Sequence, residues 1–289
     1  MKYLPEFLRQ EYDRMRALTR DVPELREHDI NTSDVLRAYI ILADYFANEK
    51  SENAETMLVG LRDAGLLHSA IDRQDVGFAN KYKYDTPQEI CATLFFGLVK
   101  DHAFLDGNKR TALLVLLYQL QLFRLLPKVK AYHFENLVVS VAENSVPDVY
   151  EKQYRKFEAG DDAVVRTIAD VLRGWTAKKD ASWDVEPTIR AFCKALEQYG
   201  VQCDYRSNGN LHFERRITAN GDSRSLAANM RLSGGGTART IGPSKTREIL
   251  ENLELYQQFA SYKDILKGED PLYELVSRYE VPLGRLKDK

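Results

Sequence analysis

Apolar residues recur every three or four positions through the first part of the chain, as they do along one face of an amphipathic helix. This spacing predicts a short helix from Pro5 to about Thr19. A second helix is expected to begin after Asn31, Thr32 and Ser33, because such side chains accept hydrogen bonds from the first amides of a helix. The apolar positions of this second helix are Val35, Tyr39, Ile40, Leu42, Ala43 and Phe46.

The pattern changes between Met57 and Asp85, where glycines interrupt short apolar pieces. Such a segment predicts a loop that includes a hairpin, and we regard it as a candidate flap. The helical pattern resumes at Thr86-Pro87-Gln88-Glu89, with proline at the first helical position and an acidic residue in the first turn. We expect this helix to end near Lys100.

The segment from Asn108 to Leu126 is apolar on nearly every face, which predicts a helix buried on all sides. Further helical patterns are present at 135–143, 149–158 and 163–175, and they complete a mainly helical first domain. Apolar periodicity is lost near Lys179, and the polar stretch Ala177–Ser182 is the best candidate for a domain boundary.

The remaining residues predict a smaller α+β domain. A helix is expected from Pro187 to Tyr199, ended by Gly200. Three strand-like runs follow at 201–206, 211–218 and 223–232, separated by two turn sequences typical of hairpins. A helix from Thr246 to Tyr262 and another short helix in the tail complete this part. The expected organisation is a helical extension at 1–29, a mainly helical domain at 30–180 and the α+β domain at 184–289.

Composition limits the kinds of partner. The 289 residues include 41 basic and 43 acidic side chains, so the net charge of −2 gives no bulk attraction to nucleic acid or to an anionic membrane. The three cysteines, Cys91, Cys193 and Cys203, have no spacing typical of a zinc site or of a disulfide framework. Together with the absence of a signal-peptide pattern at the N-terminus, this predicts a cytoplasmic protein.

The strongest chemical signal is the sequence HAFLDGNKRTAL, from His102 to Leu113. It lies where a loop leads into the predicted buried helix, and the amides at the start of a helix attract anions. Lys109 and Arg110 add positive charge, and Gly107 allows a phosphate to approach the backbone. Asp106 offers an oxygen ligand suited to magnesium.

His102 begins the same loop and is the obvious general base within it. An imidazole near neutral pH accepts a proton from an attacking hydroxyl group. The combination of this base with a phosphate-binding turn predicts phosphate-group transfer.

The motif resembles the Fic/Doc (Fido) family, and within it the death-on-curing toxins, whose pattern H-x-F-x-D-[G/A]-N-K-R-T-A-L is matched at every fixed position. Residues 60–70, GLRDAGLLHSA, resemble the flap signature R-D-x-G-L-L-x-S-A of the same group. The resemblance is good over 30–126 and loose over 132–175, and it does not extend beyond Ser182.

The resemblance implies a mainly helical Fido fold with a flap hairpin, and a role for each matched residue. His102 would be the general base, Phe104 the anchor of the loop and Asp106 the ligand of Mg²⁺. The phosphates of ATP would lie against Gly107, Asn108, Lys109 and Arg110. Arg62 and Asp63 would belong to the flap, which aligns a protein substrate by strand addition.

Three departures from the adenylylating pattern H-P-F-x-[D/E]-G-N-G-R-x-x-R indicate which phosphate is transferred. Ala103 replaces proline, Lys109 replaces the second glycine and Leu113 replaces the final arginine. The resemblance then implies that ATP presents its γ-phosphoryl group to a Ser or Thr hydroxyl of a bacterial protein, by analogy with the family one used in translation. Transfer of AMP is the alternative.

The resemblance also bears on regulation. Ser51 and Glu55 have the spacing of the family's inhibitory motif, but Thr56 occupies a position that the motif reserves for glycine or asparagine. We therefore expect control by a separate antitoxin chain or by the second domain.

The helix–strand–strand–strand–helix order of the second domain weakly resembles double-stranded-RNA-binding and HicA-like domains. Between Arg206 and Arg247 basic residues outnumber acidic ones, which predicts a local basic surface that binds RNA. A solvated sheet face or a docking surface for a protein are the alternatives. If the basic surface does bind RNA, a third function is open for the whole chain, that of a nucleic-acid-binding regulator with a non-catalytic Fido scaffold.

Overall fold

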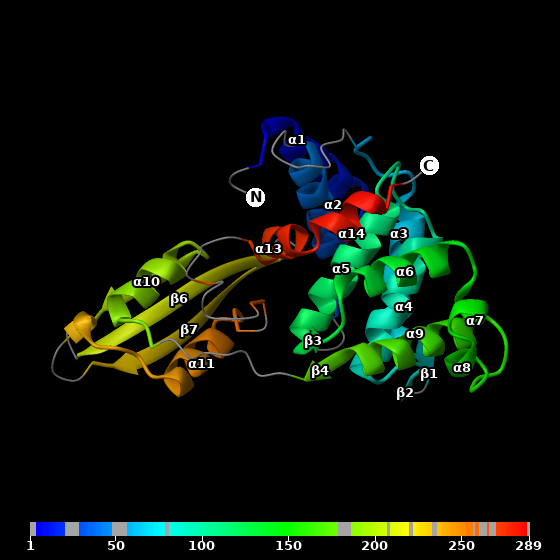
Figure 1. Cartoon of the computed structure of the whole chain (residues 1–289). Coiled ribbons are helices and arrows are strands. Elements are labelled where there is room, and N and C mark those ends of the chain that lie inside the picture. The colour runs from blue at the N-terminus through cyan, green and yellow to red at the C-terminus, as the bar shows by residue number, and fades with distance from the viewer. Residues whose placement is uncertain are drawn as a thin grey trace. The chain divides into compact units, whose positions relative to one another are not determined.

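A computed structural model describes residues 4–20, 29–47, 57–78, 81–178, 186–206, 209–219, 222–232, 236–256, 258–259, 265 and 270–287. The chain divides into two compact units (Figure 1). The first unit comprises Met1–Lys178 and Leu272–Lys289, and the second comprises Lys179–Pro271. The chain passes from the first unit to the second between Lys178 and Lys179, which lies within the predicted boundary at 177–182. Ser51 and Glu55 lie outside the described residues.

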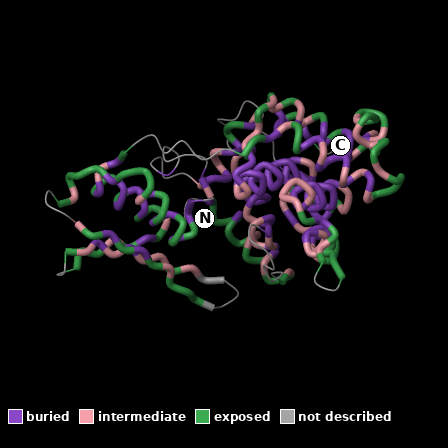
Figure 2. Tube along the Cα trace, turned by 90° about the horizontal axis from the view of Figure 1, so that it is seen from below, coloured by how far each residue is buried: buried purple, intermediate pink, exposed green. Residues whose placement is uncertain are grey.

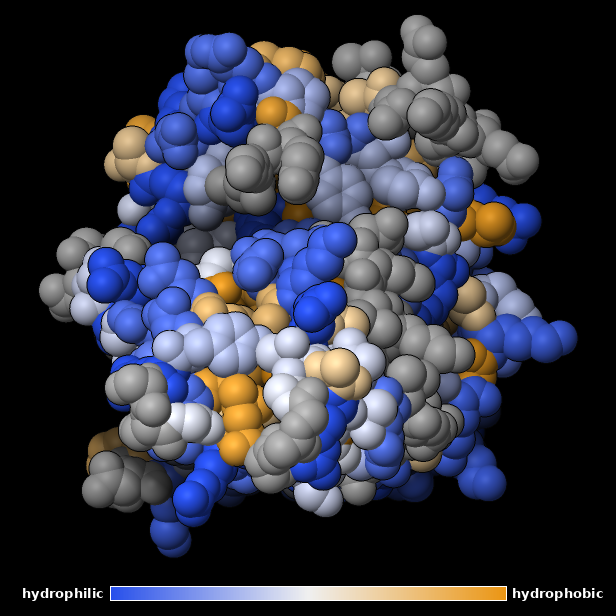
Figure 3. Space-filling view, turned by 90° about the vertical axis from the view of Figure 1, so that its left-hand side faces the viewer, coloured by the Kyte–Doolittle hydropathy of each residue, from blue (hydrophilic) through white to orange (hydrophobic). Residues whose placement is uncertain are grey.

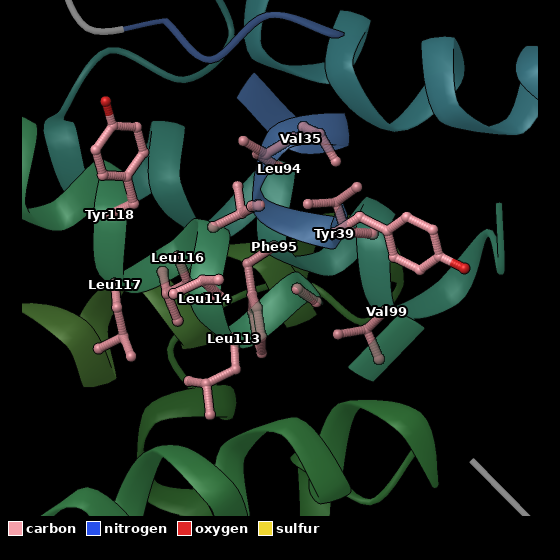
Figure 4. Packing of buried hydrophobic residues seen from close by; sticks show 14 of the residues in the cluster. Val35, Tyr39, Leu94, Phe95, Val99, Leu113, Leu114, Leu116, Leu117 and Tyr118 are labelled. Atoms are coloured by element: carbon pink, nitrogen blue, oxygen red, sulfur yellow. The ribbon is translucent and has the colours of Figure 1, made fainter. Parts of the chain in front are cut away.

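The first unit is built around helix α5 (Asn108–Leu122), in which every residue but Lys109 and Leu122 is buried. Buried residues gather in the middle of this unit (Figure 2). Helices α2 (Thr32–Ala47), α4 (Pro87–Lys100) and α6 (Ala131–Ala142) pack against it. Because its leucines point outward in several directions, α5 contributes to the core on all sides (Figure 4). The prediction of a helix buried on every face is confirmed, although α5 ends at Leu122.

Further elements of the first unit, from residues before 179, enclose this core. They are α1 (Glu6–Leu18), α3 (Ala64–Asp72), β1 (Gly77–Phe78), β2 (Lys81–Tyr82), β3 (Leu125–Pro127), α7 (Val146–Val149), α8 (Glu151–Tyr154), α9 (Asp161–Trp175) and β4 (Thr176–Lys178). Antiparallel pairs form between β1 and β2 and between β3 and β4. The prediction that the helix from Asn108 reaches Leu126 was wrong at its end, because Leu125 and Leu126 pair with β4.

Local sequence explains where α4 begins. The Thr86 hydroxyl accepts a hydrogen bond from the Glu89 amide at 3.3 Å, and the Glu89 carboxylate accepts one from the Thr86 amide at 3.1 Å. This reciprocal capping box satisfies amides that the helix itself leaves without an acceptor. The predicted start and end of this helix are both confirmed.

The segment between Met57 and Asp85 differs from the predicted loop. Residues 64–72 form α3, which begins where the Asp63 carboxylate accepts hydrogen bonds from the amides of Gly65 and Leu66. An aspartate that caps a helix favours helical structure even in a short segment that contains glycine. The pairing of β1 with β2 follows α3, and the role of this region as a flap stays a prediction.

The tail of the chain also differs from the prediction. Helices α13 (Pro271–Arg278) and α14 (Glu280–Arg285) were expected to belong to the α+β domain, but Leu272–Lys289 is part of the first unit. The reason is an apolar stripe that is buried in the core of that unit. Its members are Leu272, Leu275, Val276, Tyr279, Leu283 and Leu286.

The second unit has the predicted order of elements. It contains α10 (Ile189–Glu197), β5 (Val201–Tyr205), β6 (Asn210–Ala219), β7 (Asp222–Arg231) and α11 (Pro243–Asn252). The strands form one antiparallel sheet in the order β5-β6-β7. Leu211 and Phe213 face the core that α10 and α11 cover. Helix α11 ends at Asn252, ten residues before the predicted end at Tyr262.

The surface of the molecule matches its charged composition. On the face that Figure 3 presents, hydrophilic side chains predominate and apolar ones form small patches among them. Within the part of the chain that the structure describes, no helix has the length and apolar character that a membrane span requires.

Candidate functional site

The sequence motif forms the connection between α4 and α5. The Asp101 amide continues the helical hydrogen bonding of α4 by donating to the Gly97 carbonyl at 2.8 Å. His102 then adopts a left-handed backbone with φ of 49°, which is costly for a residue with a side chain and turns the chain sharply out of the helix. The His102 side chain is exposed. The structure thus places the predicted base at the surface.

The buried side chain of Asn108 closes this connection into a compact loop. Its Oδ1 accepts a hydrogen bond from the Phe104 amide at 2.9 Å, and its Nδ2 donates one to the Phe104 carbonyl at 3.0 Å. Asn108 is the first residue of α5, so this pair of hydrogen bonds fixes residue 104 beside the start of that helix. His102, two residues earlier, is therefore held near the same helix start.

Phe104 anchors the loop from beneath, as the sequence predicted. Its side chain is 1% exposed and stacks on the ring of Tyr39, with ring centroids 4.0 Å apart. The Tyr39 hydroxyl accepts a hydrogen bond from the Gly60 amide at 2.9 Å. One aromatic pair thereby connects α2, the motif loop and the segment that precedes α3.

That preceding segment, residues 60–63, runs antiparallel to the motif loop. The amides of Arg62 and Asp63 both donate to the Ala103 carbonyl, at 2.8 and 3.2 Å, and the Leu105 amide donates to the Gly60 carbonyl at 3.0 Å. The structure therefore brings Arg62 and Asp63 to the motif through their backbones. The Asp63 carboxylate serves as the cap of α3.

Asp106 and Gly107 form the turn that begins α5. The Asp106 carboxylate accepts a hydrogen bond from the Gly107 amide at 2.6 Å, and the side chain is partly exposed. The described residues contain no cluster of three or more His, Cys, Asp or Glu side chains suited to a metal. A magnesium ion held by one carboxylate, phosphate oxygens and water fits this donor set, because Mg²⁺ keeps several waters and is bound mainly with substrate phosphates.

Replacement of Gly107 by alanine is expected to lower the free energy of unfolding by at least about 1–2 kcal/mol. Gly107 has φ of 78°, a conformation that costs residues with a side chain about this amount. A Cβ at this position would also lie only 2.4 Å from Cε of Met57. Urea unfolding of the full chain measures the change.

Gly174→Ala in α9 is the matched control, because a Cβ there meets nothing within 4 Å. In a helix, alanine is more stable than glycine by about 0.5–1 kcal/mol. A Gly107→Ala protein as stable as wild type would show that the turn tolerates a side chain, contrary to this description.

The two cations of the motif contact the tail of the chain. The Lys109 Nζ donates a hydrogen bond to the Lys287 carbonyl at 3.2 Å, and the Arg110 Nε donates one to the Leu283 carbonyl at 3.1 Å. The guanidinium of Arg110 also lies over the Phe46 ring, 4.8 Å from its centroid. Since Arg110 is 1% exposed, it lies beneath the turn and not on the phosphate-binding surface that the sequence predicted for it.

An acidic residue adjoins the predicted base. Burial raises the pKa of Asp101 above its usual value, while electrostatic interactions with Arg73 and His102 act in the opposite direction. Asp101 therefore interacts with both of these residues. Nothing in the sequence motif identifies Asp101 as part of the site.

The residues of the site lie within a segment that matches a known protein family. A family model matches residues 28–120, which contain α2, the 60–63 segment, α4, the motif loop and most of α5. These residues match the Fic/DOC family. Enzymes of the Fic/DOC family are transferases that move AMP or phosphoryl groups. No curated protein and no solved structure matches the chain.

The Fic/DOC segment includes every residue that the sequence singled out for the site, but two contributors were missed. Tyr39 was identified only as a core residue of its helix, although its ring supports Phe104. The Leu283 carbonyl, 173 positions after Arg110, gives no signal in a sequence because any residue has a carbonyl group. An arginine among the apolar residues of α5 was the available sign that a buried acceptor is present.

Proposed function

We propose that the first unit transfers the γ-phosphoryl group of ATP to a Ser or Thr hydroxyl of a bacterial protein, as a cytoplasmic Doc-like toxin. The observation that supports this proposal most directly is the closed loop. It holds an exposed His102 near the first turn of α5 through the Asn108 side chain. A base and a phosphate-binding helix start are the two parts that such a transfer requires.

The roles follow from these positions. His102 would accept the proton of the attacking hydroxyl, and the first turn of α5 from Asn108 would bind phosphate oxygens through its amides. When bound, Mg²⁺ would neutralise charge on the transferred group, and the partly exposed Asp106 would hold it. Arg110 would add positive potential from beneath the turn, since it does not reach the surface.

Lys109 supports γ-transfer over AMP transfer. Its side chain is half-buried at the start of α5, where the adenylylating pattern of the family has a glycine. A long cation leaves less room beside the turn than a glycine does, and it attracts the terminal phosphate. AMP transfer is the alternative within the same family.

Labelled ATP distinguishes the two reactions. The full chain is incubated with a bacterial extract and ATP labelled at either the γ or the α position. We expect protein-bound label only from the γ position, and no such label with the His102→Ala chain. Label retained only from the α position would replace the proposal by AMP transfer, and absence of label in both arms would contradict a transferase function.

We further propose, as the second candidate, that the α+β unit binds RNA. A groove of about 400 Å³ lies between the end of β7 and the start of α11, and the described residues that line it include Arg231, Arg239 and Lys245 but no acidic residue. Other parts of the predicted basic surface are compensated, for example by the ion pair of Arg224 with Glu254, and within the groove Lys245 also pairs with Glu248. RNA binding that weakens steeply as salt rises, and weakens further in Arg231→Ala, would support this candidate.

A further inference from the structure

The second unit contains a pocket of about 770 Å³ that lies against α10 and β5. Its lining includes Cys193 from the helix and Cys203 from the strand, together with Arg190, Lys194, Glu197 and Tyr205. Neither cysteine belongs to the site proposed for phosphoryl transfer. The pocket is therefore a separate place where two nucleophilic side chains face the same space.

The two cysteines adjoin the same core. Cys193 is a buried member of the core of this unit, Cys203 packs against that core, and both line the pocket. A hydrogen bond between the two thiols is the largest influence on the pKa of each. Cys203 occupies the middle of β5, opposite Phe213 in the register of the sheet, and α10 packs against that strand. Helix and strand thus bring both cysteines to one pocket, and formation of a disulfide requires that the two residues be neighbours.

The hydrogen bond makes the two thiols unequal. It lowers the pKa of Cys193 below its usual value, because the Cys203 thiol stabilises the thiolate of Cys193. It raises the pKa of Cys203, to which burial and the charges of Glu197 and Asp204 also contribute. A thiolate is the form that reacts with oxidants, so Cys193 is the nucleophile of the pair.

Charged groups of both signs face this pair. Arg190 and Lys194 on α10 line the pocket and favour a thiolate, while Glu197 opposes it. Tyr205 has a raised pKa and is therefore neutral near pH 7. The third cysteine provides a contrast, because Cys91 is fully buried in α4 and burial raises its pKa well above the usual value.

We propose that Cys193 and Cys203 form a site of reversible oxidation that takes hydrogen peroxide as its oxidant. The Cys193 thiolate attacks one oxygen of the peroxide, the O–O bond breaks, and a sulfenic acid and hydroxide are produced. The sulfur of Cys203 then attacks the sulfur of Cys193, the S–O bond breaks, and the displaced hydroxide takes up the Cys203 proton. Two thiols and one peroxide thus give one disulfide and two waters. The new bond joins α10 to β5.

The test is oxidation of the reduced full chain with one equivalent of peroxide at neutral pH. We expect two of its three thiols to be lost. Mass spectrometry of the digested protein should show one linked pair of peptides that contains Cys193 and Cys203, and a dithiol reductant should restore both thiols. Retention of all three thiols, preferential oxidation of Cys91, or links only between separate chains would overturn the proposal.

Two variants separate the roles of the cysteines. Cys203→Ser should stop the reaction at a sulfenic acid on Cys193, detectable with a reagent that captures this group, and it should give no disulfide. Cys91→Ser is the matched control and should form the disulfide at the wild-type rate. Equal sulfenic acid formation at Cys91 and Cys193 in the Cys203→Ser chain would contradict the selectivity inferred here.

Discussion

Replacement of His102 by alanine is expected to slow γ-phosphoryl transfer about 10²–10⁴-fold, the usual contribution of a positioned general base. The side chain is exposed, and the strained backbone of residue 102 leaves α4 in a fixed direction. The imidazole therefore contributes little to the stability of the fold. Initial rates of label transfer from γ-labelled ATP to extract proteins measure the effect. The melting temperature should remain close to wild type, because no core contact is lost.

His212→Ala is the matched control, since it removes a partly exposed histidine from β6 in the other unit. That imidazole contacts the Asn229 side chain at 2.8 Å and takes no part in the proposed transfer. We expect the control to transfer label at the wild-type rate. If expression of His102→Ala stopped bacterial growth as strongly as wild type, while the chain bound RNA with a steep salt dependence, the nucleic-acid-binding regulator would be the better account.

The parts of the fold that were predicted correctly are those in which local chemistry decides the structure. Helix α4 begins at a capping box and α5 is apolar on every face, so neither requires knowledge of distant residues. The three strands of the second unit follow in the same way from alternating residues and hairpin turns. The motif loop was located correctly because its residue types are chemically specific.

The parts that were missed depend on contacts between distant segments. Helix α3 was read as loop because glycines weaken its helical pattern, yet it is stabilised by the Asp63 cap and by packing of Leu67 in the core. The tail was assigned to the neighbouring domain because it follows that domain in sequence. Its apolar stripe fits the first unit, and an amphipathic pattern does not say which core it covers.

Replacement of Leu283 by alanine is expected to lower the free energy of unfolding of the first unit by about 2–5 kcal/mol. The side chain is 0% exposed and lies in the core that contains α5 and α6. The substitution retains the carbonyl that accepts the hydrogen bond from Arg110. The decrease in the free energy of unfolding therefore measures the packing of the tail and not removal of that hydrogen bond. Urea unfolding of the full chain gives the magnitude.

Hydrogen exchange shows which unit is affected. Amides of α5 and α6 should lose protection in Leu283→Ala, whereas those of β5, β6 and β7 should exchange as in wild type, because the tail belongs to the first unit. Val281→Ala on the same helix is the control. Its side chain is 55% exposed, and an exposed position of this kind changes stability by no more than about 0.5 kcal/mol. Loss of protection in the sheet alone would instead assign the tail to the second unit, and equal effects of the two substitutions would show that α14 is not packed through Leu283.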